Sequence, residues 1–204
     1  FDELNFDYMR FPSDGDMKDI DFLWSKGMTK PEALEHFFAY LHESLAPIGA
    51  KLSVDLFGMT TTNTDDMNIG QVLERAMPYF DFVAPMVYPS HYPPYFNNWK
   101  NPNEHAYDVV YFSMSRAVER AVATTTLVAH FGGERIGTST PAIYTKEAYD
   151  KNKLRPWLQE FDYGGNYGPA EVRAQIQATY DSGLNSWFLW DPRNVYTKEA
   201  LKIE

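Results

Sequence analysis

The chain has 204 residues, of which 44% are hydrophobic, 23% charged and 16% aromatic, a composition typical of folded globular proteins. Its formal net charge of −10 disfavours a nucleic acid partner, because an acidic surface repels phosphate backbones. The absence of cysteine excludes disulfides, thiol catalysis and cysteine-ligated metal centres, and no apolar run approaches the ~20 residues of a membrane-spanning segment.

The first part of the chain alternates strand-like and helix-like segments. A strand is predicted at Phe1–Tyr8, where apolar and polar residues alternate. A helix is predicted at Pro31–Leu45, with apolar residues at helical spacing and Thr29 in the N-cap position. Lys51–Phe57 is predicted to be a short buried strand, and Ile69–Met77 a short helix.

The second part continues this alternation. A strand is predicted at Asp81–Tyr88 and a long amphipathic helix at His105–Ala123. Leu127–Phe131 is apolar, but a loop rich in Gly, Thr and Ser follows it. The remaining predicted elements are a strand at Leu154–Phe161, a helix at Pro169–Ser182, a strand at Ser186–Trp190 and a terminal helix or tail at Tyr196–Ile203.

Strands that alternate with helices predict a parallel sheet covered by helices, which either an open doubly wound sheet or a (β/α)8 barrel satisfies. Polar and aromatic residues follow most strands, as the active face of a barrel requires, and no glycine-rich turn is placed to hold a dinucleotide. We therefore expect residues 1–204 to form one domain of α/β class, an incomplete (β/α)8 TIM barrel with about the last five βα units. Because the first strand begins at Phe1 without a lead-in, the earlier strands are expected to be absent.

Six blocks of the sequence, taken together and in order, carry a family resemblance. They are FDELNFDYMRFPS (Phe1–Ser13), VDLFGMTTT (Val54–Thr62), IGQ (Ile69–Gln71), DFVAPMVYPSHY (Asp81–Tyr92), LRPWLQEF (Leu154–Phe161) and WFLWDPRNVY (Trp187–Tyr196). The chain resembles the bacterial domain family DUF4015 from end to end, departing from it at Asp191, where an Asn would be expected. Members of that family are predicted to be TIM-barrel glycosidases. The resemblance therefore implies a glycoside hydrolase in a secreted or cell-envelope setting, with further barrel strands ahead of the first block.

Glycoside hydrolysis generally uses two carboxyl groups, about 5–5.5 Å apart in retaining enzymes and about 6.5–9.5 Å apart in inverting ones. Because parallel strands lie ~4.8 Å apart, carboxyls at the ends of neighbouring strands meet this requirement. Asp7 ends the first strand, and a nearby Arg10 would hold it ionised as a nucleophile or base; alternatively, the two merely fix a loop. Asp55 lies in an apolar stretch of the next strand, where burial would suit a proton donor; alternatively, it bonds the loop at Thr60–Thr62.

The other candidates are expected to bind a carbohydrate substrate. The 16% aromatic content indicates either an aromatic-rich core or, alternatively, a cleft lined for flat ligands such as sugar rings. Trp157 and Gln159 alternate on one face of their strand, so both can point into the barrel mouth. Glu160 would then point outward toward the helices or lie in the loop, or, with the register shifted by one residue, become a rival acid. His91 is either a ligand of a sugar hydroxyl or structural. The expected substrate-binding residues are Tyr8, Arg10, Tyr88, Ser90, His91, Arg155, Trp157, Gln159, Trp190 and Asp191, with Asn194 and Tyr196 as loop caps or ligands.

Neither a metal nor a cofactor is expected. The histidines other than His91 are scattered along the sequence, and hydrolysis by two carboxyl groups needs no cofactor. Asp81 begins its strand and lies at the end of a barrel that usually serves stability, so we exclude it from the site. Two alternatives stay open: a barrel that binds glycan without cleaving it, and metal-assisted hydrolysis.

Overall fold

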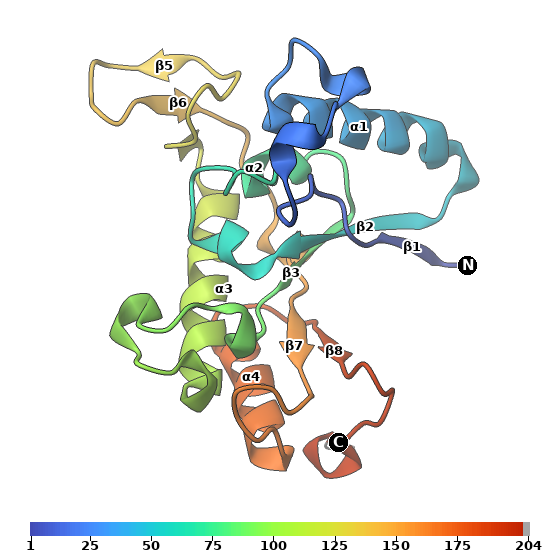
Figure 1. The fold of residues 1–204 in the computed structure, drawn as a ribbon, viewed down its shortest axis with the longest axis vertical. Coiled ribbons are helices and arrows are strands. Elements are labelled where there is room, and N and C mark those ends of the chain that lie inside the picture. Colours follow the sequence, from blue (N-terminus) through green and yellow to red (C-terminus); the bar gives the residue numbers. More distant parts are fainter. Residues whose placement is uncertain (202–204) are drawn as a thin grey trace.

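The computed structural model describes residues 1–201, and its centre is a curled, five-stranded parallel sheet (Figure 1). Helices connect the successive strands, so the predicted α/β class and parallel order are confirmed, and the sheet forms a half-barrel. In sheet order the strands are β1 (Glu3–Phe6), β2 (Lys51–Phe57), β3 (Phe82–Met86), β7 (Trp157–Gln159) and β8 (Phe188–Trp190). The helices are α1 (Lys30–Leu45), α2 (Leu73–Ala76), α3 (Ala106–Val122) and α4 (Pro169–Asp181).

Local signals in the sequence set the ends of the long helices. Thr29 caps α1 in a capping box with Glu32, and Pro31 occupies the first turn, where its missing N–H leaves no bond unmade. Gly49 follows α1 with a left-handed φ of 77°, and Gly183 follows α4 with a φ of 85°. The predicted bounds of α1, α3 and α4 are each confirmed to within one residue.

All the predicted strands except β2, and the predicted helix at Ile69–Met77, are shorter than expected, and two of these elements have a clear local cause. The strand predicted at Leu154–Phe161 narrows to β7, because Pro156 has no N–H for the ladder and only an isolated bridge joins Leu154 to Val83. The helix predicted from Ile69 begins only at Leu73, because Gly70 has a left-handed φ of 84° and Val72 is extended.

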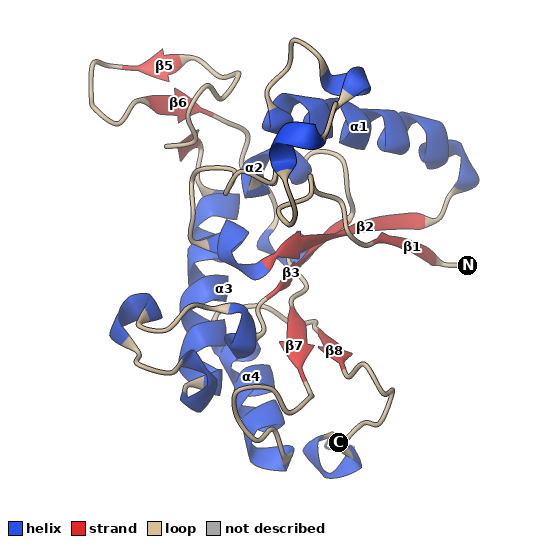
Figure 2. Ribbon diagram, in the orientation of Figure 1, coloured by secondary structure: helices blue, strands red, loops and turns tan. Residues whose placement is uncertain are grey.

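A second, antiparallel sheet was not predicted from the sequence. It has the strand order β4 (Thr125–Thr126), β6 (Ile143–Thr145) and β5 (Arg135–Ile136), and it projects beyond the C-terminal end of α3 (Figures 1 and 2). Strands of two or three residues are too short to show an alternating pattern, which is why this segment was expected to be a loop. The predicted terminal element contains a single 3-10 turn at Lys198–Ala200, and its end, Ile203, lies outside the described residues.

The two faces of the parallel sheet carry different side chains. The face under the helices is apolar and includes the buried residues Leu52, Val54, Leu56, Val83 and Leu158. The opposite face, inside the curl, carries the alternate residues of the same strands, and these include the polar side chains of Asn5, Ser53 and Asp55. None of the helices within residues 1–201 is long and apolar enough to span a membrane.

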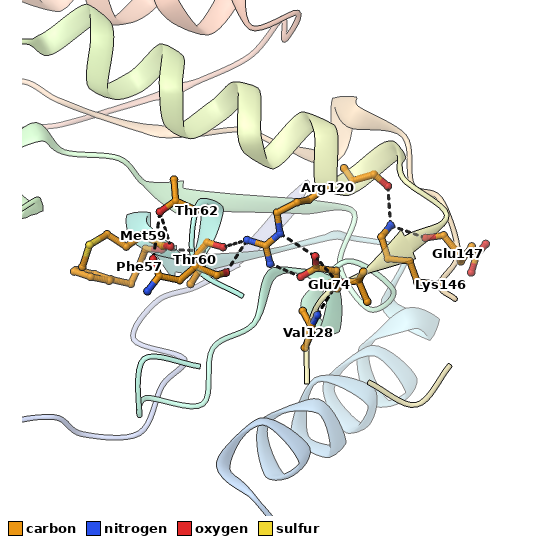
Figure 3. Close-up of polar contacts among 12 residues, drawn as sticks. Phe57, Met59, Thr60, Thr62, Glu74, Arg120, Val128, Lys146 and Glu147 are labelled. Atoms are coloured by element: carbon orange, nitrogen blue, oxygen red, sulfur yellow. Dashed lines mark hydrogen bonds and ion pairs between the residues drawn. The ribbon is translucent and has the colours of Figure 1, made fainter. Parts of the chain in front are cut away.

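A buried ion pair fixes the loop that follows β2 (Figure 3). Arg120 on α3 pairs with Glu74 on α2, and its Nε donates to Glu74 Oε1 at 2.8 Å. The guanidinium also donates to the carbonyl oxygens of Thr60 and Asn63. Because Glu74 is only 2% exposed, this charged pair attaches the turn Gly58–Thr61 firmly to two helices.

Candidate active site

Asp55 lies on the inner face of the sheet, on β2. The residue is only 4% exposed. Both oxygens of its carboxyl group accept hydrogen bonds. Oδ1 accepts from Trp157 Nε1 at 2.7 Å, and Oδ2 accepts from Asn5 Nδ2 at 3.0 Å. Ser53 Oγ donates to Asn5 Oδ1 at 2.6 Å, which fixes the orientation of that amide and turns its NH₂ group toward the carboxyl.

The environment of Asp55 favours its protonated form. Burial raises the pKa of Asp55 to about 6, although the hydrogen bonds from Trp157 and Asn5 act to lower it. The negative charges of Asp7 and Glu3 raise the pKa of Asp55 further. A carboxyl with a pKa near 6 can hold a proton at mildly acidic pH and give it to a leaving group.

The alternative role considered for Asp55, a hydrogen bond to the loop backbone at Thr60–Thr62, is wrong, because its carboxyl oxygens accept from Trp157 and Asn5. The three threonine hydroxyls donate instead to backbone carbonyls of the same turn, those of Phe57, Gly58 and Met59. The turn is therefore closed by its own side chains, and the Asp55 carboxyl is left to face the interior of the curl.

Asp7 directly follows β1 and lies beside Asp55 in the register of the sheet. Phe6, the last residue of β1, pairs with Val54, so the next position of each strand is Asp7 and Asp55. Asp7 is exposed, and its Oδ1 accepts from the backbone N–H of Tyr8 at 2.6 Å. The two candidate carboxylates thus project from neighbouring strands.

Arg10 does not pair with Asp7, contrary to our expectation. Tyr8 adopts a left-handed φ of 58°, and this turn directs Arg10 away from the carboxylate. Its guanidinium lies 4.4 Å from the centre of the Tyr8 ring and donates to Ser13 Oγ at 3.0 Å. Among residues 1–201, no ion pair joins Arg10 to Asp7, so this arginine orders the loop and supports the exposed Tyr8 ring.

Aromatic side chains form a wall beside Asp55. The Trp157 ring stacks on Phe188 at 4.4 Å between centroids and meets the 43% exposed Trp190 edge-on at 6.1 Å. The exposed Trp190 indole, beside the ring that bonds the Asp55 carboxyl, suits stacking against a sugar ring.

Tyr88 and His91 continue the wall after β3. Their rings pack edge-to-face at 5.0 Å, and His91 also stacks on Phe57 at 6.1 Å. Burial, and then the charges of Asp55 and Asp7, raise the pKa of Tyr88, so its hydroxyl stays protonated. Partial burial of its ring lowers the pKa of His91, so the imidazole is favoured in its neutral form.

Gln159 and Asp191 do not reach the surface of the site, so our expectation that they contact substrate is wrong. Gln159 is fully buried, and its amide accepts from Ser90 N at 3.1 Å and donates to Phe161 O at 3.0 Å. Asp191 is also fully buried, and both of its oxygens accept from Arg193. Each of these two side chains therefore holds a loop in place. Gln159 holds the loop after β3, because it accepts from the backbone N–H of Ser90.

Arg155 pairs with a carboxylate, but with Glu3 at the beginning of β1 and not with Asp7 or Asp55. Its Nη1 lies 2.9 Å from Glu3 Oε2, and the guanidinium lies 3.5 Å from the centre of the Phe82 ring. Arg155 therefore covers the inner face of the sheet at the beginning of β1 and β3, below the candidate site.

A family model described as "Putative glycosyl hydrolase domain", DUF4015, matches residues 1–196. The chain belongs to the DUF4015 family. No curated protein matches its sequence.

This DUF4015 domain shares its fold with a solved structure that matches nearly its whole length. The spore cortex-lytic enzyme SleL of Bacillus megaterium is 12% identical, with a TM-score of 0.55 over 98% of this chain and 47% of that one. The PgaB (BpsB) glycoside hydrolase domain from Bordetella bronchiseptica is 16% identical, with a TM-score of 0.47 over 82% of this chain and 38% of that one. The DUF4015 chain therefore spans less than half the length of either structure.

Sequence reasoning missed three polar residues that build the site of this DUF4015 domain: Asn5, Ser53 and Gln71. The sequence did contain a signal for Asn5 and Ser53, because each lies two residues before a candidate aspartate and so shares its face of the strand.

Within residues 1–201, no three His, Asp or Glu side chains gather as metal ligands would. Glu160 directly follows β7, is buried, and accepts from the backbone N–H of Thr197.

Proposed function

We propose that this DUF4015 domain is the C-terminal part of a (β/α)8-barrel glycoside hydrolase that cleaves a polysaccharide with a pair of carboxyl groups. The observation that carries the proposal is Asp55, a buried carboxyl with a pKa of about 6, bonded to the indole of Trp157. Asp7 follows the neighbouring strand and contributes to that raised pKa, which supports a shared site. Membership of the family supports the reaction class.

The two carboxyl groups differ in environment, and this difference suggests their roles. We assign Asp55 as the general acid that protonates the glycosidic oxygen, because burial favours its protonated form. Asp7 is exposed, and we assign it as the nucleophile or the general base on the other side of the scissile bond. The carboxyl pair supplies both the acid and its partner, so the reaction needs no cofactor.

The substrate of this proposal is a carbohydrate chain held against the aromatic wall. Trp157 and Trp190 offer stacking surfaces, and Tyr8 presents a ring that is 62% exposed beside Asp7. His91 and Tyr88 supply polar groups near the carboxyls. The proposal also includes a complete barrel, which the curl of the five parallel strands supports. It further includes a secreted or cell-envelope location.

The test is to incubate the full-length protein with a panel of polysaccharides and count the reducing ends released. Asp7→Asn and Asp55→Asn are each expected to abolish release without unfolding the protein. Asp81→Asn is the matched control, because Asp81 bonds Lys51 and the backbone of Leu52 at the beginning of the strands. Full activity in either Asp7→Asn or Asp55→Asn would remove that residue from the mechanism. Tight binding of a glycan with no product would favour a glycan-binding barrel instead.

A further inference from the structure

The segment Ile69–Gln71, one of the six sequence blocks, takes no part in the chemistry proposed above. It lies just ahead of α2, where Gly70 adopts a left-handed φ of 84°. A β-carbon at Gly70 would come within 2.9 Å of Leu34 and 3.1 Å of the carbonyl oxygen of Lys30. Only glycine fits this turn, which places the side chain of the next residue in the interior.

Gln71 uses both ends of its amide to join β2 to the loop that follows β1. Its Oε1 accepts from the backbone N–H of Phe57 at 2.8 Å, and its Nε2 donates to the carbonyl oxygen of Met9 at 2.9 Å. Nε2 also lies 3.4 Å from the carbonyl oxygen of Asp55 itself. Since Gln71 is 1% exposed, water does not compete for these bonds.

A backbone contact reinforces this bridge. The carbonyl oxygen of Ile69 accepts from the N–H of Phe11 at 2.8 Å. Met9 and Phe11, which lie two and four residues after Asp7, are therefore both attached to the same short segment.

We propose that Gln71 is a positioning residue that sets the spacing between the Asp7 and Asp55 carboxyl groups. The inference rests on the proposed function, in which these two groups act on one bond. Its physical basis is that one rigid amide joins the backbone of Asp55 and Phe57 to that of Met9, across the boundary between the two strands. Because a displacement of about 1 Å can cost roughly a hundredfold in rate, such a bridge matters to the chemistry as well as to stability.

The test compares Gln71→Met with Gln175→Met. Gln175 is a matched control because it is fully buried and its amide also bonds strand backbone, accepting from Gln159 N at 2.9 Å and donating to Gln159 O at 2.8 Å. Both substitutions keep the side-chain volume and remove the same kind of bond, but only Gln71 touches the segments that carry the two aspartates. We expect both variants to lose stability and only Gln71→Met to lose about a hundredfold in kcat/KM.

A second readout needs no substrate. Asp7, Glu3 and Tyr88 are the titratable groups coupled to Asp55, and the charge of Asp7 raises the pKa of Asp55. Asp7→Asn should therefore lower the Asp55 pKa measured by carboxyl ¹³C NMR. In the Gln71→Met background we expect most of this decrease to disappear, whereas in Gln175→Met it should persist.

An unchanged effect of Asp7→Asn in the Gln71→Met background would overturn the positioning role. If Gln71→Met does not fold, Gln71→Asn replaces it, because that amide is one methylene too short to join both segments. Loss of the coupling in a protein that hydrolyses no glycan would support the positioning role while rejecting the proposed function, so the two claims fail separately.

Discussion

Trp157 on β7 donates its indole N–H to Asp55 on β2 at 2.7 Å, and the bond passes over the strand that lies between them, β3. Ala84 is the residue of β3 in register with Asp55, and its methyl group leaves room for the indole to reach across. The acid of the candidate site is thereby joined to its aromatic wall.

The bond between Trp157 and Asp55 predicts different defects for two tryptophan variants. Trp157→Phe keeps a ring to stack on Phe188 but removes the donor, so the pKa of Asp55 should rise and the pH dependence of kcat should move to higher pH. Trp190→Ala leaves that donor in place and should mainly raise KM. Steady-state kinetics from pH 4 to pH 8 separate the two, and identical pH profiles would contradict the prediction for Trp157.

Asn5 is expected to tune the acid in the same direction. Its amide acts to lower the Asp55 pKa, so Asn5→Leu should raise this pKa above its value of about 6. The fall in activity at high pH, where the acid loses its proton, should shift by the same amount. Ser53→Ala removes only the bond that orients the amide and should have a smaller effect. A carboxyl ¹³C titration that is the same in wild type and Asn5→Leu would contradict this prediction.

The raised pKa of Asp55 also predicts how stability depends on pH. The pKa is about 6 in the folded protein and 3.8 as an ordinary value, so the folded state holds the proton more tightly. The stability contributed by this group is fully present below pH 3.8 and is lost as pH rises through about 6. Relative to Asp55→Asn, wild type should therefore lose at most about 3 kcal/mol of unfolding free energy across this window. Urea denaturation at several pH values measures the difference, and a constant difference would contradict it.

The ion pair between Arg120 and Glu74 is expected to dominate the stability of the loop after β2. Arg120→Met leaves a buried, unpaired carboxylate and should cost about 3–5 kcal/mol in urea unfolding. Arg116→Met is the control, because its pair with Glu119 is exposed and should contribute less than about 1 kcal/mol. Adding Glu74→Leu to Arg120→Met should recover much of the loss, and no recovery would show that the unpaired charge is not its cause.

Sequence patterns predicted the strands that carry the candidate residues, but not the contacts between them. Alternation and register placed Asp7 and Asp55 on neighbouring parallel strands, and the structure has them there. The wrong expectations have local causes that pattern does not reveal. A left-handed residue, Tyr8, turns Arg10 away, and Gln159 lies on the expected face but too deep to meet a ligand. The Trp157–Asp55 bond depends on the order of strands in the sheet and on the small size of Ala84.

The hydrogen bonds that assemble the site join residues far apart in the sequence. Gln71 and Met9 are separated by 62 positions, and Trp157 and Asp55 by 102. Such contacts form only after long loops have closed, so no short stretch of the chain contains a partial version of the site. During synthesis, both aspartates leave the ribosome well before the indole that completes their surroundings. The acid should therefore titrate as an ordinary aspartate until the fourth strand of the sheet has docked, and its chemistry should begin only once folding is nearly finished.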